Sequence, residues 1–331
     1  MRHRLSQLLA ALAGGLTVWV LSTAVAAPAP ISLSGGDSRA VVTVPSTATT
    51  WPTPAVVATA EPTATAALPA AAASQVLVEP TDIATATPTT VYLPTPDAVV
   101  GTRDVVLRIL TYHYVEPWPV DASPLRAGLT VRPEDFAAQM DYLAANGYTT
   151  VSLYDLIDTL ATGRPLPDKP VVLTFDDGYA GLFPYAVPIM AAHHQTGTVF
   201  VITELVDQAR PEYLTWSQLR FMHDLGWSVE PHTKSHIGLQ GLSYERQLYE
   251  MLGSIETVEA NLGARPRFFN YPSGSYDATT LQLAPELGLW GAVTTQGGWY
   301  HRYADRYTLT RLRVTGNIDL PHFIDMLGQE R

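Results

Sequence analysis

The amino-acid sequence predicts an α/β fold in which a mostly parallel sheet closes into a barrel. Strand-like and helix-like segments alternate from about residue 105 onwards, and this alternation is typical of parallel sheets covered by helices. It continues over about 225 residues, a length that favours a barrel. Polar residues follow several of the predicted strands, which is where the chemistry of such barrels lies.

The first half of this region alternates strands with helices whose ends are recognisable. Residues 105–112 are an apolar, strand-like run. A helix is expected next, opened by Arg132 and Pro133 and ended by Gly147. The elements expected after it are a strand at 149–153, a helix around 156–160, a buried strand at 171–175, a helix at 183–192 and a strand at 198–202.

The second half continues the same pattern. Its expected elements are a helix at 216–225 closed by Gly226, a strand at 228–230, a helix at 243–262 closed by Gly263, a strand at 268–271 and a late strand at 309–314. Asp176, His232 and Tyr271 fall where predicted strands stop. Because parallel strands end at the same side of a barrel, we expect these side chains to lie at one end of it.

Two segments precede the predicted barrel. Residues 1–27 have a basic start, an apolar stretch and the cleavage pattern Ala24-Val25-Ala26, which together predict a signal peptide. Left uncleaved, the stretch is just long enough to be a membrane anchor, the one membrane contact we expect. Residues 28–104, rich in Ala, Thr and Pro, predict a disordered linker. The domain at residues 105–331 is therefore expected to be extracellular or attached to the cell envelope.

Composition excludes several classes of chemistry. The formal net charge of -11 argues against nucleic acid as a partner, because phosphate binding needs clustered Lys and Arg. The chain has no cysteine, which excludes a disulfide framework, a thiolate nucleophile and Cys-ligated zinc. Any metal must therefore be held by His, Asp and Glu.

The strongest local signal is the adjacent pair Asp176 and Asp177, followed by Gly178, after a buried strand. Two carboxylates at such a place are costly unless a cation neutralises them. If one of them binds a metal, the other can act as a general base. The alternative is an Asp-Asp-Gly turn with solvated carboxylates.

A second signal is the pair His232 and His236. Histidines four residues apart meet on one face of a helical turn and suit a divalent metal; the alternative is two surface histidines. One Asp with two His is the open three-ligand set of catalytic zinc, which predicts Zn²⁺, with Co²⁺ or Ni²⁺ also fitting.

With these two motifs the chain resembles the polysaccharide deacetylases, the carbohydrate esterase family with the nodulation-protein homology domain. Residues 174–177, Thr-Phe-Asp-Asp, match its first motif, and residues 232–236 match its second, over a resemblance spanning residues 108–314. The resemblance implies a deformed parallel (β/α)7-type barrel. It assigns Asp176 as base and Asp177, His232 and His236 as metal ligands.

The family's third motif, Arg-Pro-Pro-Tyr-Gly, is only partly kept. Residues 270–274 read Asn-Tyr-Pro-Ser-Gly, so the turn still offers Tyr271 and the Ser273 backbone N–H to the substrate and oxyanion. The arginine that would hold Asp176 is missing. Arg311 or Arg313, from the late strand, is the expected replacement; the alternative is that both are exposed on an edge strand.

The family's last motif supplies a histidine as general acid, and here the late strand ends in Arg. His113, after the first strand, takes that place if the barrel is circularly permuted as in the poly-N-acetylglucosamine deacetylase-like subgroup. The alternative is a core histidine. Trp299, Tyr300 and Tyr276 are candidates for stacking on sugars. The remaining histidines are expected to be structural: His193, His194, His223, His301 and His322.

The resemblance predicts an exported hydrolase that removes N-acetyl groups from GlcNAc-containing polymers such as peptidoglycan, chitin or poly-N-acetylglucosamine. An acetylated amino-sugar polymer is thus the expected partner, and a monomer the expected state. Two alternatives remain: an O-acetyl (xylan) esterase using the same site, and a catalytically inactive cell-wall carbohydrate-binding protein.

Overall fold

The computed structural model describes residues 93–99, 103–118, 120 and 122–328. The predicted signal peptide at 1–27 and most of the predicted linker at 28–104 lie outside the described residues. Within the described part, no helix is both long and apolar enough to cross a membrane.

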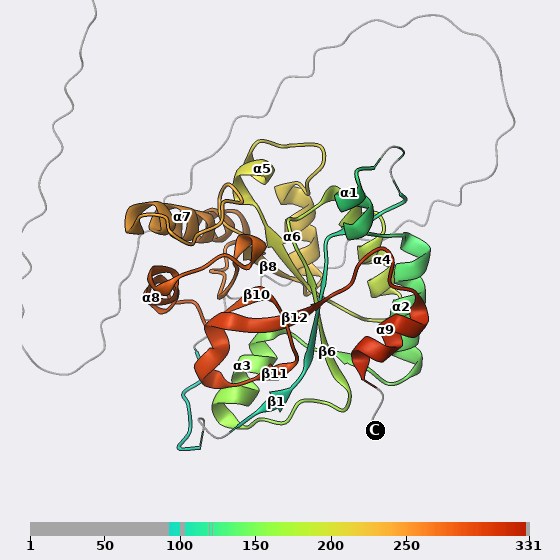
Figure 1. Cartoon of the computed structure of the whole chain (residues 1–331), viewed down its shortest axis with the longest axis horizontal. Coiled ribbons are helices and arrows are strands. Elements are labelled where there is room, and N and C mark those ends of the chain that lie inside the picture. The colour runs from blue at the N-terminus through green and yellow to red at the C-terminus, as the bar shows by residue number, and fades with distance from the viewer. Residues whose placement is uncertain (1–92, 100–102, 119, 121, 329–331) are drawn as a thin grey trace, which may run out of the picture. The chain divides into compact units, whose positions relative to one another are not determined.

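Eight parallel strands form the central sheet, shown in Figure 1 with helices around it. They are β2 (Arg108–Tyr112), β5 (Thr149–Thr150), β6 (Pro170–Phe175), β7 (Thr198–Val201), β8 (Ser228–Pro231), β9 (Phe268–Asn270), β10 (Gly291–Gly297) and β12 (Leu309–Arg313). Seven of them follow the order β8-β7-β6-β2-β12-β10-β9, and β5 pairs with β6 beside this series. The result is a nearly closed parallel barrel, which confirms the predicted fold.

The first strand of the barrel is a neighbour of its last. Leu110 of β2 pairs with Leu173 of β6 on one side and with Leu312 of β12 on the other. This is the neighbour relation that a circular permutation requires. It also places β12 between β10 and β2, inside the sheet, so the alternative of an edge strand for Arg311 is wrong.

Helices cover the barrel. They are α1 (Pro124–Leu129), α2 (Pro133–Ala145), α3 (Leu153–Thr162), α4 (Ala186–Ala191), α5 (Thr203–Asp207), α6 (Trp216–Asp224), α7 (Tyr244–Leu262), α8 (Ala278–Glu286) and α9 (Leu320–Leu327). In Figure 1, α7 and α8 lie on one side of the strands and α2, α4 and α9 on the other.

The helix α7 shows how local sequence sets an element's ends. The Ser243 side chain accepts a hydrogen bond from the Arg246 amide at its start, and Gly263 ends it with a left-handed φ of 73°. The first is a strong start signal and the second a strong stop signal, and the predicted and observed ends of this helix agree to within one residue.

Two short strand pairs lie outside the barrel. In one, β1 (Val105–Val106) runs antiparallel to β11 (Tyr300–His301); in the other, β3 (Tyr114–Val115) pairs with β4 (Thr130–Val131). The run 105–112, predicted as one strand, is therefore two strands that separate at Leu107, whose amide donates to the Trp299 carbonyl.

The hydrogen bond from the Leu107 amide to the Trp299 carbonyl also shows where Trp299 and Tyr300 lie. They lie at the amino end of β2, whereas His113 follows its carboxyl end. Our prediction that these two aromatic side chains stack on a substrate at the site is therefore wrong, because a strand of five residues separates them from it, about 16 Å.

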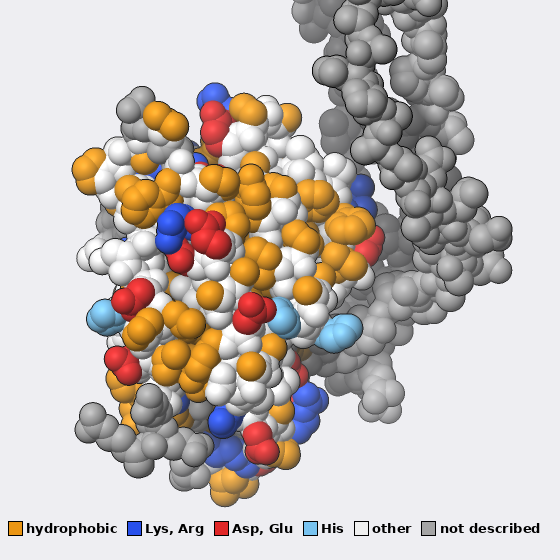
Figure 2. Space-filling model, turned by 90° about the vertical axis from the view of Figure 1, so that its right-hand side faces the viewer, with side chains coloured by type: hydrophobic (Ala, Val, Ile, Leu, Met, Phe, Trp, Pro, Cys, Tyr) orange, Lys and Arg blue, Asp and Glu red, His pale blue; other side chains and the backbone are white. Residues whose placement is uncertain are grey.

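The inner and outer layers of the molecule differ as expected for a barrel. The strand β6 is buried on both faces over Val171 to Phe175, as parallel strands between helices are. The outer face over α2 and α9, turned to the viewer in Figure 2, carries apolar side chains interspersed with charged ones.

Candidate metal centre and catalytic residues

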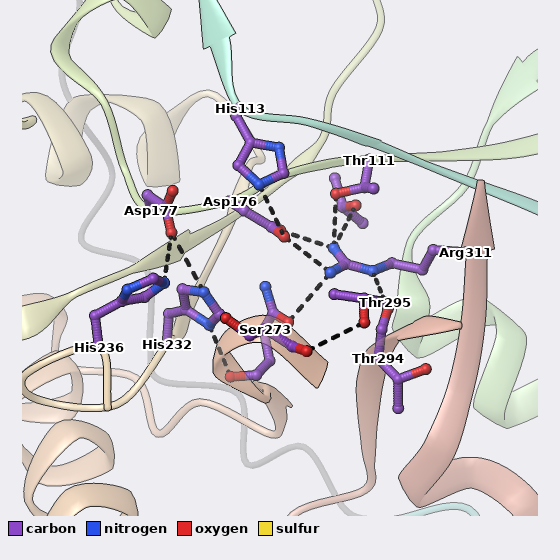
Figure 3. Close-up of polar contacts among 12 residues, drawn as sticks. Thr111, His113, Asp176, Asp177, His232, His236, Ser273, Thr294, Thr295 and Arg311 are labelled. Carbon is purple, nitrogen blue, oxygen red and sulfur yellow. Dashed lines mark hydrogen bonds and ion pairs between the residues drawn. The ribbon is translucent and has the colours of Figure 1, made fainter. Parts of the chain in front are cut away.

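Three side chains meet at the carboxyl end of the barrel. The ligand atoms of Asp177, His232 and His236 all lie within 4.8 Å of one another. Oδ1 of Asp177 is 3.3 Å from Nε2 of His232 and 3.2 Å from Nε2 of His236 (Figure 3). The structure thus brings together the Asp-His-His set that the two motifs predicted, with His236 the most exposed of the three.

These residues fit a divalent cation. Oδ1 of Asp177 is buried and has no hydrogen-bond partner among the described residues, a costly state for a carboxylate that a metal would relieve. Burial raises the pKa of Asp177, but its contacts with His232 and His236 outweigh burial and hold that pKa well below the ordinary value. The carboxylate is therefore ionised, as a ligand must be.

A backbone carbonyl on the side away from Asp177 orients the ring of His232. Its Nδ1 lies 2.7 Å from the carbonyl oxygen of Asn270 on β9, and this contact assigns the proton to Nδ1. Nε2, which faces Asp177, is then free to bind a metal. Such a partner on the far nitrogen is the usual support of a metal-binding histidine.

The segment that carries the two histidines is a loop, and our prediction of a helical turn is wrong. Thr233 and His236 have left-handed φ angles of 63° and 61°, which a helix excludes. The His236 amide donates to Oγ1 of Thr233 at 2.9 Å. A tight loop, with the hydroxyl closing it, therefore brings the second histidine back beside the first.

Asp176 forms a paired, buried carboxylate. Arg311 donates from Nη1 to Oδ1 at 2.7 Å and from Nη2 to Oδ2 at 2.8 Å (Figure 3). Burial raises the pKa of Asp176, but the charge and hydrogen bonds of Arg311 outweigh it and lower that pKa to about 2. Arg311 is thus the partner of Asp176; Arg313, by contrast, is exposed.

His113 lies on the other side of Asp176. Its Nε2 is 4.0 Å from Oδ2 of Asp176, and the side chain is mostly buried. Nδ1 of His113 is buried without a hydrogen-bond partner in the described part of the chain. Burial lowers the pKa of His113, opposed by the charges of Asp176 and Asp177.

The turn after β9 holds the two remaining predicted residues. Ser273 is exposed, with a left-handed φ of 56°, and its carbonyl accepts from Oγ1 of Thr295 at 3.3 Å (Figure 3). Tyr271 is fully buried, with its ring centroid 5.2 Å from that of Tyr276 and the two rings tilted by 35°, and its hydroxyl has no partner within the described residues. Ser273 is therefore accessible to a substrate, and Tyr271 belongs to the wall beneath it.

Sequence reasoning missed one residue of this site. Asn270 accepts from Nη2 of Arg311 through its side chain, at 3.2 Å, and from His232 through its carbonyl. It therefore links Arg311, the partner of Asp176, to His232, one of the predicted metal ligands. The signal was present, because Asn270 stands where the family motif has its arginine.

The other histidines lie outside the site. His193 pairs with Asp141 and His322 with Asp319, and Nε2 of His301 lies 2.9 Å from the Leu107 carbonyl.

A parallel barrel with an Asp-His-His group and a second, paired carboxylate at one end defines a class of metal-dependent hydrolase. The polysaccharide deacetylase family model matches residues 163–292. The chain is 31% identical over 209 residues to the putative polysaccharide deacetylase YxkH of Bacillus subtilis, covering 63% of this chain and 71% of that protein. The chain belongs to the polysaccharide deacetylase family.

Further relatives share the same domain. The poly-beta-1,6-N-acetyl-D-glucosamine N-deacetylase of Escherichia coli K12 is 30% identical over 259 residues, which cover 66% of this chain and 38% of that enzyme. The deacetylase PplD of Streptococcus pyogenes, solved in complex with acetate, superposes with a TM-score of 0.63 and 29% identity, covering 69% of this chain and all of that one. The chain thus spans well under half of the E. coli enzyme.

Proposed function

We propose that this protein is an exported, metal-dependent deacetylase that hydrolyses the N-acetyl groups of GlcNAc-containing polymers. One observation carries the proposal: Asp176, kept ionised by Arg311, stands beside the Asp177, His232 and His236 group at one end of the barrel. The E. coli relative is a poly-beta-1,6-N-acetyl-D-glucosamine N-deacetylase, and this supports an amino-sugar polymer as the substrate class. Peptidoglycan and chitin present the same group.

Each residue has a distinct task in this proposal. Asp176 accepts the proton of the attacking water, and Arg311 keeps it ionised and oriented. His113 donates a proton to the departing amine, and the Ser273 N–H donates to the oxyanion. Asp177, His232 and His236 hold a divalent metal, Zn²⁺ first and Co²⁺ or Ni²⁺ as alternatives. When bound, this cation supplies Lewis acidity to a carbonyl oxygen and lowers the pKa of water.

Export rests on residues 1–27, whose composition is that of a signal peptide or an anchor. Such a location would bring the domain to the polymers of the cell envelope. Fractionation of cells producing the full chain tests it: the protein is expected outside the cytoplasm, and retention in the cytoplasm would contradict export.

Replacing Asp176 with Asn tests the mechanism. Acetate release from GlcNAc oligomers is expected to fall by about 10²–10⁴, while metal content stays at the wild-type level, because Asp176 is not among the three ligands. Asp135, an exposed carboxylate on α2 that pairs with Arg132, gives the control variant Asp135→Asn, whose activity should not change.

Three results would contradict the proposal. Undiminished acetate release by Asp176→Asn would show that Asp176 is not the general base. Acetate release by the wild type from acetylated xylan, with none from GlcNAc oligomers, would identify an O-acetyl esterase with the same site. Metal-loaded protein that binds the oligomers without turnover would identify the inactive binding protein.

A further inference from the structure

The loop at residues 232–236 needs external support to hold its shape. Thr233 is β-branched and His236 carries a large ring, yet both adopt left-handed φ angles. Non-glycine residues stay in that region only when their surroundings determine it. The loop carries two of the three proposed ligands, so whatever holds it also sets their geometry.

The first part of this support comes from hydrogen bonds donated by α5. The amides of Thr203 and Glu204 donate to the carbonyls of Thr233 and Lys234, at 3.3 and 2.9 Å. These bonds use the acceptors of the loop. Its donors, the amides of Lys234 and Ser235, point to a different partner.

That partner is a buried carboxylate on α7. Oε2 of Glu250 accepts from the amides of both Lys234 and Ser235 at 3.0 Å. Oε1 accepts from Oγ of Ser235 at 2.8 Å and lies 2.7 Å from Nη2 of Arg246, one turn earlier on the helix. Glu250 is fully buried, and among the described residues the two amides have no other acceptor.

The packing of α7 against the loop agrees with this assignment. A Cβ placed on Gly253, one turn after Glu250, would lie 2.7 Å from Cδ of Lys234. The side chain of Lys234 therefore lies directly against the helix at this point. A glycine inside a long helix is unfavourable, and here Gly253 leaves room for the Lys234 side chain.

The two histidines depend on the loop to different degrees. His232 is fixed independently, because its amide donates to the Val201 carbonyl and its Nδ1 contacts Asn270. The side chain of His236 is 40% exposed, with its ring 4.9 Å from that of His232. Its backbone bond goes to Thr233 within the same loop. A change in the loop would therefore displace His236 first.

We propose that Glu250 is a positioning residue for the metal centre, holding the loop so that His236 completes the ligand set. This inference rests on the proposed function, since it takes Asp177, His232 and His236 to bind a metal. Glu250 itself touches none of the three. It acts through the amides of Lys234 and Ser235, which lie between the two histidines.

The test measures Zn²⁺ affinity of the full-length protein by competition with a chelating dye, without any assay of activity. Glu250→Ala is expected to weaken Zn²⁺ binding about ten- to a hundred-fold, the range found when an outer partner of a metal ligand is removed. Glu250→Gln keeps one oxygen that can accept both amides but puts an NH2 group where Oε1 meets Ser235 and Arg246, so it should lose less Zn²⁺ affinity than Glu250→Ala does. Glu259→Ala, on the same helix, removes a partly buried pair with Arg265 and is the matched control.

Hydrogen exchange gives a second measurement that needs no variant. In the wild-type protein without metal, the amides of Lys234 and Ser235 should be protected, because Glu250 accepts both. Rapid exchange of these amides would overturn the proposal even if Glu250→Ala fails to fold.

The outcomes separate the two proposals. Equal Zn²⁺ affinity of folded Glu250→Ala and wild type would overturn the role of Glu250 alone. Equal losses in Glu250→Ala and Glu250→Gln would also overturn it, because the acceptor oxygen would then not matter. A wild type that binds no Zn²⁺ would overturn the metal site and the proposed function with it.

Discussion

At the scale of single residues, the contact between Asp176 and Arg311 determines most of the site's electrostatics. A buried carboxylate is costly on its own, and here both of its oxygens receive a guanidinium hydrogen bond. The guanidinium in turn contacts the hydroxyls of Thr111 and Thr174. Asp176, the proposed base, is therefore ionised and held in one orientation by Arg311.

Arg311→Lys is expected to move the pH profile of the enzyme. Burial, the largest influence on Asp176, raises its pKa, and the lysine would lose the two-point contact that lowers it to about 2. A base must be ionised to act, so the acidic limb of kcat/KM should shift to higher pH. Activity measured from pH 4 to 8 checks this, with Arg313→Lys, on the same strand but exposed, as the control. An unchanged limb would contradict the role of the pair.

The sequence identified the motif residues at this scale but could not choose between Arg311 and Arg313. The two are separated by one residue, so alternation along a strand places them on the same face. Their position along β12 makes the difference, since Arg311 lies within the barrel and Arg313 at its end. Asn270 was missed because one of its two contacts uses the backbone, which no residue type reveals.

At the scale of elements, the start of α8 is linked to α7. Asp277 accepts from the Thr280 amide as the helix cap, and it also accepts from the Gly241 amide and from Nε2 of Gln247. These hydrogen bonds, that from Gly241 first, lower the pKa of Asp277 to about 2. One carboxylate thus joins a loop and two helices.

Asp277→Ala should destabilise the protein by about 0.5–2 kcal/mol, the range for a lost helix cap. The pKa of Asp277 is depressed, so its charge contributes stability above pH 3.8, and this contribution is lost as the pH falls through about 2. The difference in stability between wild type and Asp277→Asn should therefore shrink from pH 5 to pH 2. Urea unfolding across this range measures it, and a constant difference would contradict the assignment.

Elements with strong end signals were predictable, and elements without them were not. Ser243 and Gly263 set both ends of α7 in advance. By contrast, α8 contains Pro285, and β10 runs from Gly291 to Gly297 with its last three residues exposed. Pro285 obscures the helical pattern of α8 in spite of its cap at Asp277, and β10 shows no clear period. Tertiary contacts, which a local pattern does not contain, stabilise both.

At the scale of the whole molecule, the barrel is closed by a side chain. The series of paired strands ends at β8 and β9. Glu230 of β8 accepts from the amides of Arg267 and Phe268, at 3.0 and 2.9 Å, and from the Tyr154 hydroxyl. Burial raises the pKa of Glu230 to about 8.

Glu230→Ala should therefore destabilise the whole fold, by about 1–3 kcal/mol for each buried amide left without an acceptor. Glu230→Gln keeps an accepting oxygen and should lose much less. Urea unfolding followed by circular dichroism compares the two, with the exposed Glu256 as the control position. Equal stability of the Ala and Gln variants would contradict closure by this carboxylate.

The alternation of strands and helices was sufficient to predict a parallel barrel, because each strand needs a covering helix on the way to the next. The gap between β8 and β9 was beyond prediction, since Glu230 reads as an ordinary strand residue until its neighbours are known. The pairing of β2 with β12 was predictable, because His113 precedes the other motifs in the sequence and so indicated a circular permutation.

That pairing has a consequence for synthesis of the chain. Asp176 precedes Arg311 by 135 residues, an interval on the order of ten seconds at the usual pace of translation. During that time the carboxylate has no counter-ion, so the barrel can form its finished interior only after the last strand has been made. A chain that ends prematurely before Leu309 would contain every proposed metal ligand and still lack a correctly held base. Prematurely terminated products should therefore be inactive, because they lack Arg311.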